Sequence, residues 1–270
     1  MVLYFYQWKN EYLQCMESIK EIAVPYIQIL QSPEVFREIK HGGIFVYGVL
    51  PAVSAGFHDL LLRELALKGG RFDGISLLKH TEKQRDPGIR HLSEMVDGIY
   101  IGNQGQWENA KMFRLPLFGD QGLNVFNSKT AEFWIKKGLE RVTLSYELET
   151  EQIREMWYEG EREILLYGRV PVMVSEYCPV AGEKGISKKN CGICRDGGTW
   201  HLQSKKGDRY PVLLDRDVCR STILSAFPLD RRKEMAGTGK DGREDSSTIT
   251  GRICIYDETP AQVEKILKSV

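Results

Sequence analysis

Short apolar segments that recur along the whole chain constrain its fold more than any other feature. Most of them have apolar residues at consecutive positions rather than at every second position, which is typical of parallel strands that are buried on both faces. We expect one of these candidate strands to be surplus or peripheral. The candidate strands are residues 3–6, 26–30, 44–50, 74–78, 98–101, 123–126, 142–144, 164–167 and 253–256.

Amphipathic helices are predicted between several of these strands. In SKTAEFWIKKGLE, Ser128 can cap a helix that Gly138 ends, and a second helix is predicted from Thr150 to Gly160. Near the C-terminus, Thr259 is the expected N-cap and Pro260 the first helical residue. This alternation predicts an α/β fold, and more specifically a (β/α)8, TIM-like barrel, regular or irregular, in preference to a doubly wound sheet.

The composition is typical of one globular domain that spans residues 1–270. Hydrophobic residues make up 42% of the chain, and 37 basic residues balance 37 acidic ones, so net charge favours neither nucleic acid nor an anionic membrane as a partner. The N-terminal residues do not have the pattern of a signal peptide, and the longest apolar runs are too short to span a bilayer. We therefore expect a soluble, cytoplasmic protein with no membrane partner.

Two segments interrupt the alternation. Residues 176–219 contain four of the six cysteines among Gly, Lys, Asp and Asn, which predicts a cysteine-rich insertion built around a site. Residues 230–251 are polar and glycine-rich, which predicts a mobile surface loop.

The spacing of the cysteines in the insertion favours metal binding. Cys191 and Cys194 form a CxxC pair, and Cys178 and Cys219 flank it. Four thiolates can bind zinc or an iron-sulfur cluster, and the spacing does not distinguish these two groups. Two other interpretations stay open, a redox dithiol at the CxxC pair and ordinary buried thiols, although the charged neighbours of these cysteines argue against the second.

Several motifs in this region resemble the peptidase U32 family, especially the C-terminal barrel of its long, multi-domain members. The motifs are YGRVPVMVSEYCP, KKNCGICRD and HLQSKKGDRYPVLLDRDVCRSTIL, with GDQGLNVFNS and LERVTLSYELETEQI upstream. The resemblance covers residues 97–219 and 252–270. It implies a barrel whose cysteines, here Cys178, Cys191, Cys194 and Cys219, hold a 4Fe-4S cluster. It also implies hydroxylation of RNA bases or ubiquinone precursors without molecular oxygen, while the older family name records a collagenase-like protease activity.

The chain departs from the family pattern at one customary ligand. Many members have His-Gly and then a cysteine before the position of Cys178, whereas this chain has Tyr167 and Gly168 followed by Pro171. The CxxC pair must therefore supply the replacement ligand.

Polar residues at the carboxyl ends of two predicted strands are candidates for substrate binding, because substrates bind at that end of a (β/α)8 barrel. A structural alternative is that Asn127 only caps a helix and that Glu147 is a solvated carboxylate. We add Arg220, which follows Cys219. The predicted substrate-binding residues are Asp120, Asn124, Asn127, Ser145, Glu147 and Arg220.

These features predict an enzyme, a U32-type iron-sulfur protein that acts in or supports hydroxylation of an RNA base or a similar ring. The expected partner is RNA, either tRNA or rRNA, or a second U32 domain. The alternatives are a collagenase-like peptidase and a non-catalytic, metal-stabilised RNA-binding module. The sequence contains neither an HExxH nor a GxSxG motif, which argues against two common peptidase sites. Basic residues between Lys184 and Arg209, with Trp200 and Tyr210, could contact RNA, although such a run is more often a solvated loop.

Overall fold

Parallel strands close into a barrel in the larger of two units of the chain. The computed structural model describes residues 1–50, 94–186, 191–195, 199–215, 219–235 and 249–270. Residues 1–166 and 231–270 form the barrel unit, and residues 167–230 form a second unit, which we call the cysteine unit.

The barrel has eight strands, and its closure follows from the pairing of β6 with both of its neighbours. Parallel pairing runs from β13 through β1, β2, β3, β4 and β5 to β6, and β6 then pairs in parallel with β7, which neighbours β13. The predicted TIM-like α/β barrel is therefore confirmed. The strands are β1 (Val2–Phe5), β2 (Glu21–Pro25), β3 (Phe45–Val49), β4 (Gly98–Ile101), β5 (Leu117–Gly119), β6 (Arg141–Thr143), β7 (Glu161–Gly168) and β13 (Ile249–Ile255).

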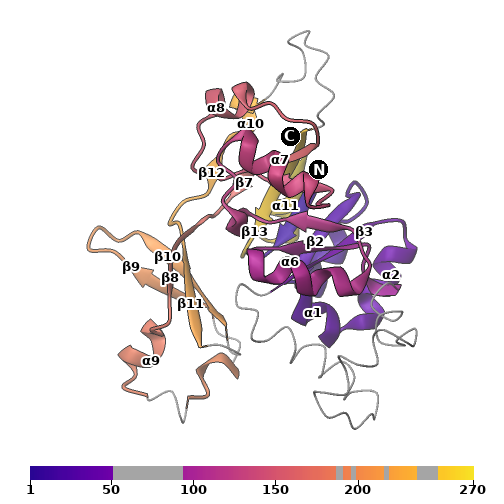
Figure 1. Cartoon of the computed structure of the whole chain (residues 1–270). Helices are drawn as coiled ribbons and strands as arrows, with labels where there is room; N and C mark the ends of the chain where they lie inside the picture. Colours follow the sequence, from indigo (N-terminus) through magenta and orange to yellow (C-terminus); the bar gives the residue numbers. More distant parts are fainter. Residues whose placement is uncertain (51–93, 187–190, 196–198, 216–218, 236–248) are drawn as a thin grey trace. The chain divides into compact units, whose positions relative to one another are not determined.

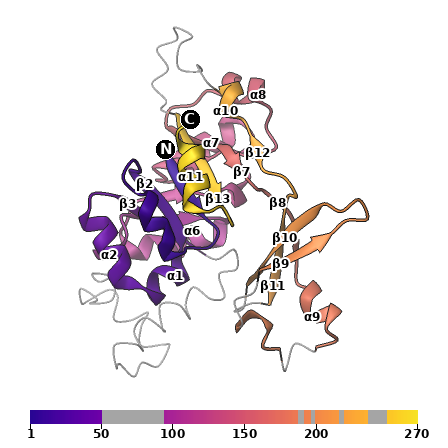
Figure 2. The same ribbon diagram turned by 180° about the vertical axis from the view of Figure 1, so that it is seen from behind.

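Helices cover the outside of the barrel. Helix α6 lies in front of the strands in Figure 1, and α11 lies in front of them in Figure 2. The bounds are α1 (Tyr26–Gln31), α2 (Pro33–His41), α6 (Gln104–Ala110), α7 (Ser128–Lys136), α8 (Thr150–Glu155), α10 (Arg232–Met235) and α11 (Pro260–Leu267), with 3-10 turns at Asn10–Cys15, Lys111–Phe113 and Gln121–Leu123.

The helix boundaries follow capping chemistry. Thr259 and Pro260 begin α11 as predicted, and Gly138 follows α7 with a positive φ of 94°, which glycine adopts readily. The N-cap of α7 is Asn127 rather than the predicted Ser128, because the Asn127 side chain accepts a hydrogen bond from the Thr130 N–H at 2.9 Å. Helix α8 ends at Glu155, five residues before the predicted stop at Gly160, because Met156 is already extended.

Two of the predicted strands are wrong. Residues 26–30 form most of α1, and the strand lies just before them at Glu21–Pro25; the burial of Tyr26 and Ile29, three residues apart, fits a helix. Residues 123–126 contribute only one bridge, between Val125 and Leu144. The left-handed conformation of Asn124, with φ 50°, interrupts the extended run, and the true strand is the short β5. The strand predicted at 74–78 lies outside the described residues.

The cysteine unit contains an antiparallel sheet with the strand order β8, β11, β10, β9. The predicted insertion, residues 176–219, lies within this unit. The elements of the cysteine unit are β8 (Pro171–Ser175), α9 (Pro179–Glu183), a 3-10 turn at Ile193–Arg195, β9 (Trp200–Gln203), β10 (Arg209–Asp215), β11 (Arg220–Leu224) and β12 (Leu229–Asp230).

The polar segment 230–251 is regular at both of its ends. Helix α10 occupies residues 232–235 and β13 begins at Ile249, while residues 236–248 of the predicted mobile loop lie outside the described part. Among the helices that the structure describes, none is long and apolar enough to cross a membrane.

Candidate functional site

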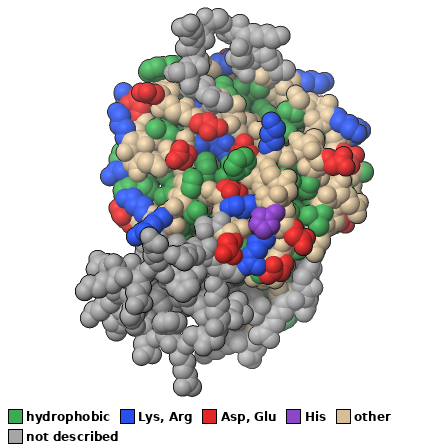
Figure 3. Space-filling view, turned by 90° about the vertical axis from the view of Figure 1, so that its right-hand side faces the viewer, with side chains coloured by type: hydrophobic (Ala, Val, Ile, Leu, Met, Phe, Trp, Pro, Cys, Tyr) green, Lys and Arg blue, Asp and Glu red, His purple; other side chains and the backbone are tan. Residues whose placement is uncertain are grey.

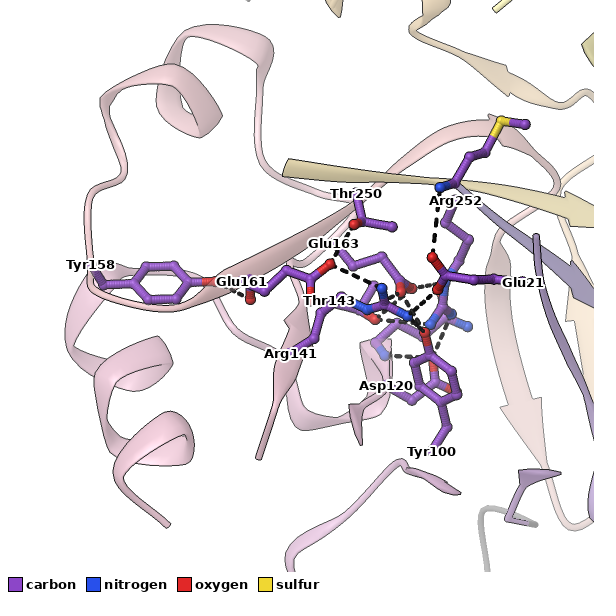
Figure 4. Close-up of polar contacts among 12 residues, drawn as sticks. Glu21, Tyr100, Asp120, Arg141, Thr143, Tyr158, Glu161, Glu163, Thr250 and Arg252 are labelled. Carbon is purple, nitrogen blue, oxygen red and sulfur yellow. Dashed lines mark hydrogen bonds and ion pairs between the residues drawn. The ribbon is translucent and has the colours of Figure 1, made fainter. Parts of the chain in front are cut away.

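A cluster of charged side chains lies inside the barrel. Figure 4 shows carboxylates, guanidinium groups and hydroxyls from several strands in mutual contact. These side chains come from alternate positions of their strands, such as Glu161 and Glu163 on β7 and Thr250 and Arg252 on β13, as expected for residues that share one face. Barrel interiors are usually filled by branched apolar residues, so this interior is exceptionally polar.

Glu163 is the centre of this cluster and is fully buried. Its carboxylate accepts hydrogen bonds from the hydroxyls of Tyr100 and Thr143, the latter at 3.0 Å. It also pairs with two guanidinium groups, that of Arg141, whose Nε lies 3.0 Å from Oε2, and that of Arg252. Because two cations and two hydroxyl donors surround it, this carboxylate is compensated in its ionised form.

Arg252 connects Glu163 to the carboxyl end of the barrel. Its Nη1 donates to Asp120 Oδ1 at 2.6 Å, and its Nη2 donates to Thr143 Oγ1 at 2.9 Å. The other Asp120 oxygen accepts from the Tyr4 hydroxyl at 3.1 Å, and the Tyr4 ring lies 4.4 Å from the Arg252 guanidinium carbon. Asp120 follows β5, so the cluster ends at the edge of the barrel where a substrate would bind.

Arg141 extends the cluster toward the amino ends of the strands. Its Nη2 donates to Glu21 Oε2 and its Nη1 to Glu161 Oε1, each at 3.0 Å. Thr250 also donates to Glu161, at 2.5 Å. Glu21 and Glu161 begin β2 and β7, and their side chains are partly exposed, so solvent screens the outer end of the cluster.

The charges of the cluster keep its cations protonated. Burial alone would lower the pKa of Arg252, but the carboxylates of Glu163 and Asp120 hold that pKa well above its ordinary value. The pKa of Tyr100 is raised by burial and by the neighbouring Glu163, so its hydroxyl stays a hydrogen-bond donor.

A second polar group lies at the carboxyl end of β1 and β13. Tyr6 is half-buried, and its side chain hydrogen-bonds with those of Gln121 and Cys254. Burial raises the pKa of the Cys254 thiol to about 12, so this thiol is neutral at physiological pH. Tyr6 and Tyr4 pack edge to face with ring centroids 5.5 Å apart, so this group adjoins the Tyr4–Asp120 pair.

The predicted substrate-binding residues of the barrel lie on the loops after β5 and β6. Asp120 and Ser145 are buried, whereas Asn124, Asn127 and Glu147 are exposed. The Ser145 N–H donates to the Val125 carbonyl at 2.9 Å, which brings the two loops together. Asp120 is bonded inside the barrel and Asn127 caps α7, so both also have structural roles. Arg220 lies in the cysteine unit, paired across β11 and β10 with Asp215.

The four cysteines predicted as metal ligands all lie in the cysteine unit, and three of them lie within electrostatic range of Cys194. Burial raises the pKa of the Cys194 thiol, and negative charge on Cys178, Cys191 and Cys219 raises it further. The six cysteines of the chain are free thiols. Within the described ranges, no three His, Cys, Asp or Glu side chains come close enough to form a metal site.

The local structure holds two of these cysteines in defined conformations. The Cys178 sulfur caps α9 by accepting a hydrogen bond from the Ala181 N–H at 3.4 Å, and Cys219 adopts a left-handed conformation with φ 52°. Near them, the Lys184 ammonium lies 4.8 Å from the centre of the Trp200 ring. His201, considered in the peptidase interpretation, contacts Arg209 through its Nδ1 at 3.3 Å.

Reasoning from the sequence missed most of the charged cluster. Arg141, Glu161, Glu163 and Arg252 stand at or beside the predicted strands, and charge at such positions reads as solvent-exposed. The sequence signal that could have found part of the cluster is the spacing of Glu161 and Glu163 by two positions, which puts both carboxylates on the same face of their strand.

Comparison with known proteins assigns the family. The family model described as peptidase family U32 matches residues 80–235, more than half of the chain. The chain belongs to peptidase family U32. A solved structure, "The Structure of the U32 Peptidase Mk0906", is similar over 96% of this U32 chain and 94% of its own, with a TM-score of 0.48 and 15% sequence identity.

Two curated relatives of the U32 chain carry the name "tRNA hydroxylation protein P". The protein from Escherichia coli (strain K12) is 31% identical over 101 residues, which are 36% of this chain and 22% of that protein. The protein from Haemophilus influenzae (strain ATCC 51907 / DSM 11121 / KW20 / Rd) is 32% identical over 87 residues, 31% of this chain and 19% of that protein. The matched stretches therefore span about a fifth of the length of these relatives.

Proposed function

We propose that this U32 protein carries a 4Fe-4S cluster in its cysteine unit and acts in or supports the hydroxylation of an RNA base. The observation that carries this proposal is the grouping of four free cysteines in one unit, where the charges of three affect the fourth. The name of the two curated relatives supports tRNA as the RNA. Free thiols suit the reducing cytoplasm, where we place the protein.

The residues present fit the proposed cofactor by ligand type and not by their spacing, because among the described residues no three such side chains lie close enough to share a metal. Cys178, Cys191, Cys194 and Cys219 would hold the cluster, since four soft thiolates form the customary ligand set of a 4Fe-4S centre. The cluster, when bound, supplies one-electron redox chemistry. The Ala181 N–H that reaches Cys178 would tune the cluster potential, because hydrogen bonds to ligand sulfurs stabilise their negative charge.

The barrel would supply the substrate side of the site. The exposed amides of Asn124 and Asn127 and the Glu147 carboxylate can hydrogen-bond to the edges of an unstacked base, and the Ser145 hydroxyl can bind a sugar or phosphate oxygen. In the cysteine unit, Arg220 can bind a phosphate by itself. Asp120 would act as a fixed acceptor at the barrel end, because Arg252 and Tyr4 hold its carboxylate in one orientation.

Metal analysis of single cysteine variants tests the cofactor. We expect protein purified without oxygen to contain iron and sulfide, and each Cys→Ser change among the four ligands to remove most of the iron. Cys15→Ser and Cys254→Ser serve as matched controls that keep the iron, because both thiols are buried in the barrel unit. Protein that binds zinc and no iron would instead indicate a metal-stabilised RNA-binding module.

A double variant tests the substrate side. Asn124→Ala with Glu147→Ala should weaken tRNA binding and base hydroxylation, measured by mass spectrometry of tRNA digests, while the melting temperature stays within a few degrees of wild type, since both side chains are exposed. Unfolding of this variant, or unchanged hydroxylation, would contradict the assignment of these residues.

A further inference from the structure

Arg231 lies at the point where the chain returns from the cysteine unit to the barrel. It follows β12 directly, and its backbone N–H donates to the Leu166 carbonyl at 2.8 Å, at the point where β7 leaves the barrel unit. β12 pairs with β7 immediately beyond, where Asp230 faces Tyr167. The backbone of Arg231 is therefore fixed to both strands that connect the two units.

The side chain of Arg231 reaches the loop between β6 and α8, residues 145–149, which we call the rim loop. Its Nη2 donates to the carbonyls of Tyr146 at 2.8 Å and Leu148 at 2.5 Å. Arg231 is buried, with 8% of its surface exposed, so these charge-assisted bonds form where water competes poorly.

The rim loop has no regular secondary structure to hold it in place. It is stabilised internally by the bond from the Leu148 N–H to the Ser145 carbonyl and by a weaker contact from the Glu147 N–H to Ser145 Oγ at 3.4 Å. It carries Ser145 and Glu147, two of the proposed substrate-binding residues. The loop conformation, and with it the direction of these two side chains, therefore depends on bonds from outside the loop.

Helix α10, directly after Arg231, makes two further contacts with α8, the helix that follows the rim loop. Glu234 accepts a hydrogen bond from Thr150 Oγ1 at 2.7 Å, and its carbonyl accepts one from Arg154 at 2.6 Å. Figures 1 and 2 both show α10 beside α8. Arg231 thus holds the rim loop at Tyr146 and Leu148. Helix α10, which follows Arg231, holds α8, which follows the rim loop.

We infer that Arg231 is a positioning residue, which sets the rim loop for the substrate. The role toward substrate rests on the proposed function, whereas the role toward the loop follows from the contacts alone. Arg231 reaches the substrate only through the backbone of the rim loop, so its loss should affect binding more than turnover.

Hydrogen exchange measures the effect on the loop directly. Arg231→Met keeps the bulk of the side chain and removes both bonds to the loop, so the amides of residues 145–149 should exchange roughly tenfold faster or more. Arg231→Lys, whose ammonium can still donate to carbonyls, should restore part of the protection and provides a folded variant if Arg231→Met does not fold. The matched control is Arg232→Met, which removes bonds to Ile266 and Ser269 near the C-terminus and should leave exchange in the loop unchanged.

Binding and turnover then test the positioning role. With iron content equal to wild type, Arg231→Met should raise the KM for tRNA several-fold with little change in kcat, and Arg231→Lys should recover part of it. Exchange in the loop that stays at the wild-type rate in Arg231→Met, or that rises equally in Arg232→Met, would overturn the inference. If the protein contained no iron and bound no tRNA, the proposed function would fail, while the exchange experiment would still decide whether Arg231 holds the loop.

Discussion

At the scale of single residues, the charged interior makes the barrel sensitive to changes that preserve shape. Glu163 pairs with two buried guanidinium groups. Arg252 makes one further ion pair, with Asp120, and Arg141 makes two, with Glu21 and Glu161. Removing one partner of such a buried network leaves the other charges uncompensated, which costs more than the pair itself contributes.

Glu163→Gln should therefore destabilise the barrel strongly. The amide has the volume of the carboxylate but carries no charge, and its NH2 group would face guanidinium donors, so we expect the free energy of unfolding to fall by about 3 kcal/mol or more. Glu161→Gln is the matched control, because its side chain is 33% exposed, and should cost less than about 1 kcal/mol. Urea unfolding of the two variants distinguishes them, and equal losses would show that Glu163 is not the centre of the network.

Cys254 should make the stability of the barrel fall at alkaline pH. The unfolded thiol titrates near its ordinary value of 9.0, whereas in the folded barrel burial raises its pKa to about 12. Between these values the folded state keeps a proton that the unfolded state has lost, so the stability from this group is full below pH 9 and falls as the pH rises.

Relative to Cys254→Ser, the wild-type protein should lose about 1.4 kcal/mol of unfolding free energy per pH unit in that window, since serine does not titrate there. Urea unfolding on both sides of pH 9 measures the difference in slope. Parallel pH profiles for the two proteins would mean that the thiol titrates at the same pH in both states.

At the scale of elements, the sequence was most informative where a strand or helix had clear ends. β4 was predicted at its observed bounds, and the start of α11 followed from Thr259 and Pro260. The errors arose in short apolar runs such as residues 26–30, where strand and helix have the same composition and only the spacing of buried positions separates them. β7 was predicted too short because its first three residues are charged, and two of them, Glu161 and Glu163, face the interior.

Asn127 has two interpretations that one pair of substitutions separates. Asn127→Ala removes the cap of α7 and should lower the free energy of unfolding by about 1 kcal/mol, whereas Asn127→Ser keeps a capping oxygen and should lose only a few tenths. Chemical unfolding checks the stability of both variants. If Asn127→Ser is as stable as wild type but binds tRNA several-fold more weakly, the amide also contacts the substrate, and equal binding would restrict Asn127 to its cap.

At the scale of the whole molecule, the family, the barrel and the segment with four cysteines could be predicted, but the charged interior and the role of Arg231 could not. Both depend on contacts between distant positions, such as Arg252 with Asp120 and Arg231 with Tyr146, and no local pattern encodes these pairs. The substrate-binding residues stay a prediction, since local signals place them at strand ends without indicating what they bind.

If the cysteine unit binds the proposed metal, its removal should loosen this unit and spare the barrel. Among the described residues of that unit, the buried apolar side chains are few, namely Ala181, Ile193, Val212, Ile223 and Leu224. A small core of this kind depends on additional links such as metal ligation. Chelation should therefore speed proteolytic cleavage within residues 167–230 several-fold, as followed by mass spectrometry. Cleavage within the barrel unit is the internal control, and equal acceleration in both units would mean that the metal stabilises the whole chain.

The bond between Leu166 and Arg231 also bears on how such a protein can be taken apart and rebuilt. The chain leaves the barrel and re-enters it at two residues that already touch, 2.8 Å apart from nitrogen to oxygen, with antiparallel strands leading away from them. A short hairpin turn could replace residues 167–230, which would remove the last two residues of β7 and leave the other seven barrel strands intact. The barrel could therefore carry a different module at this position, exchanged by gene fusion.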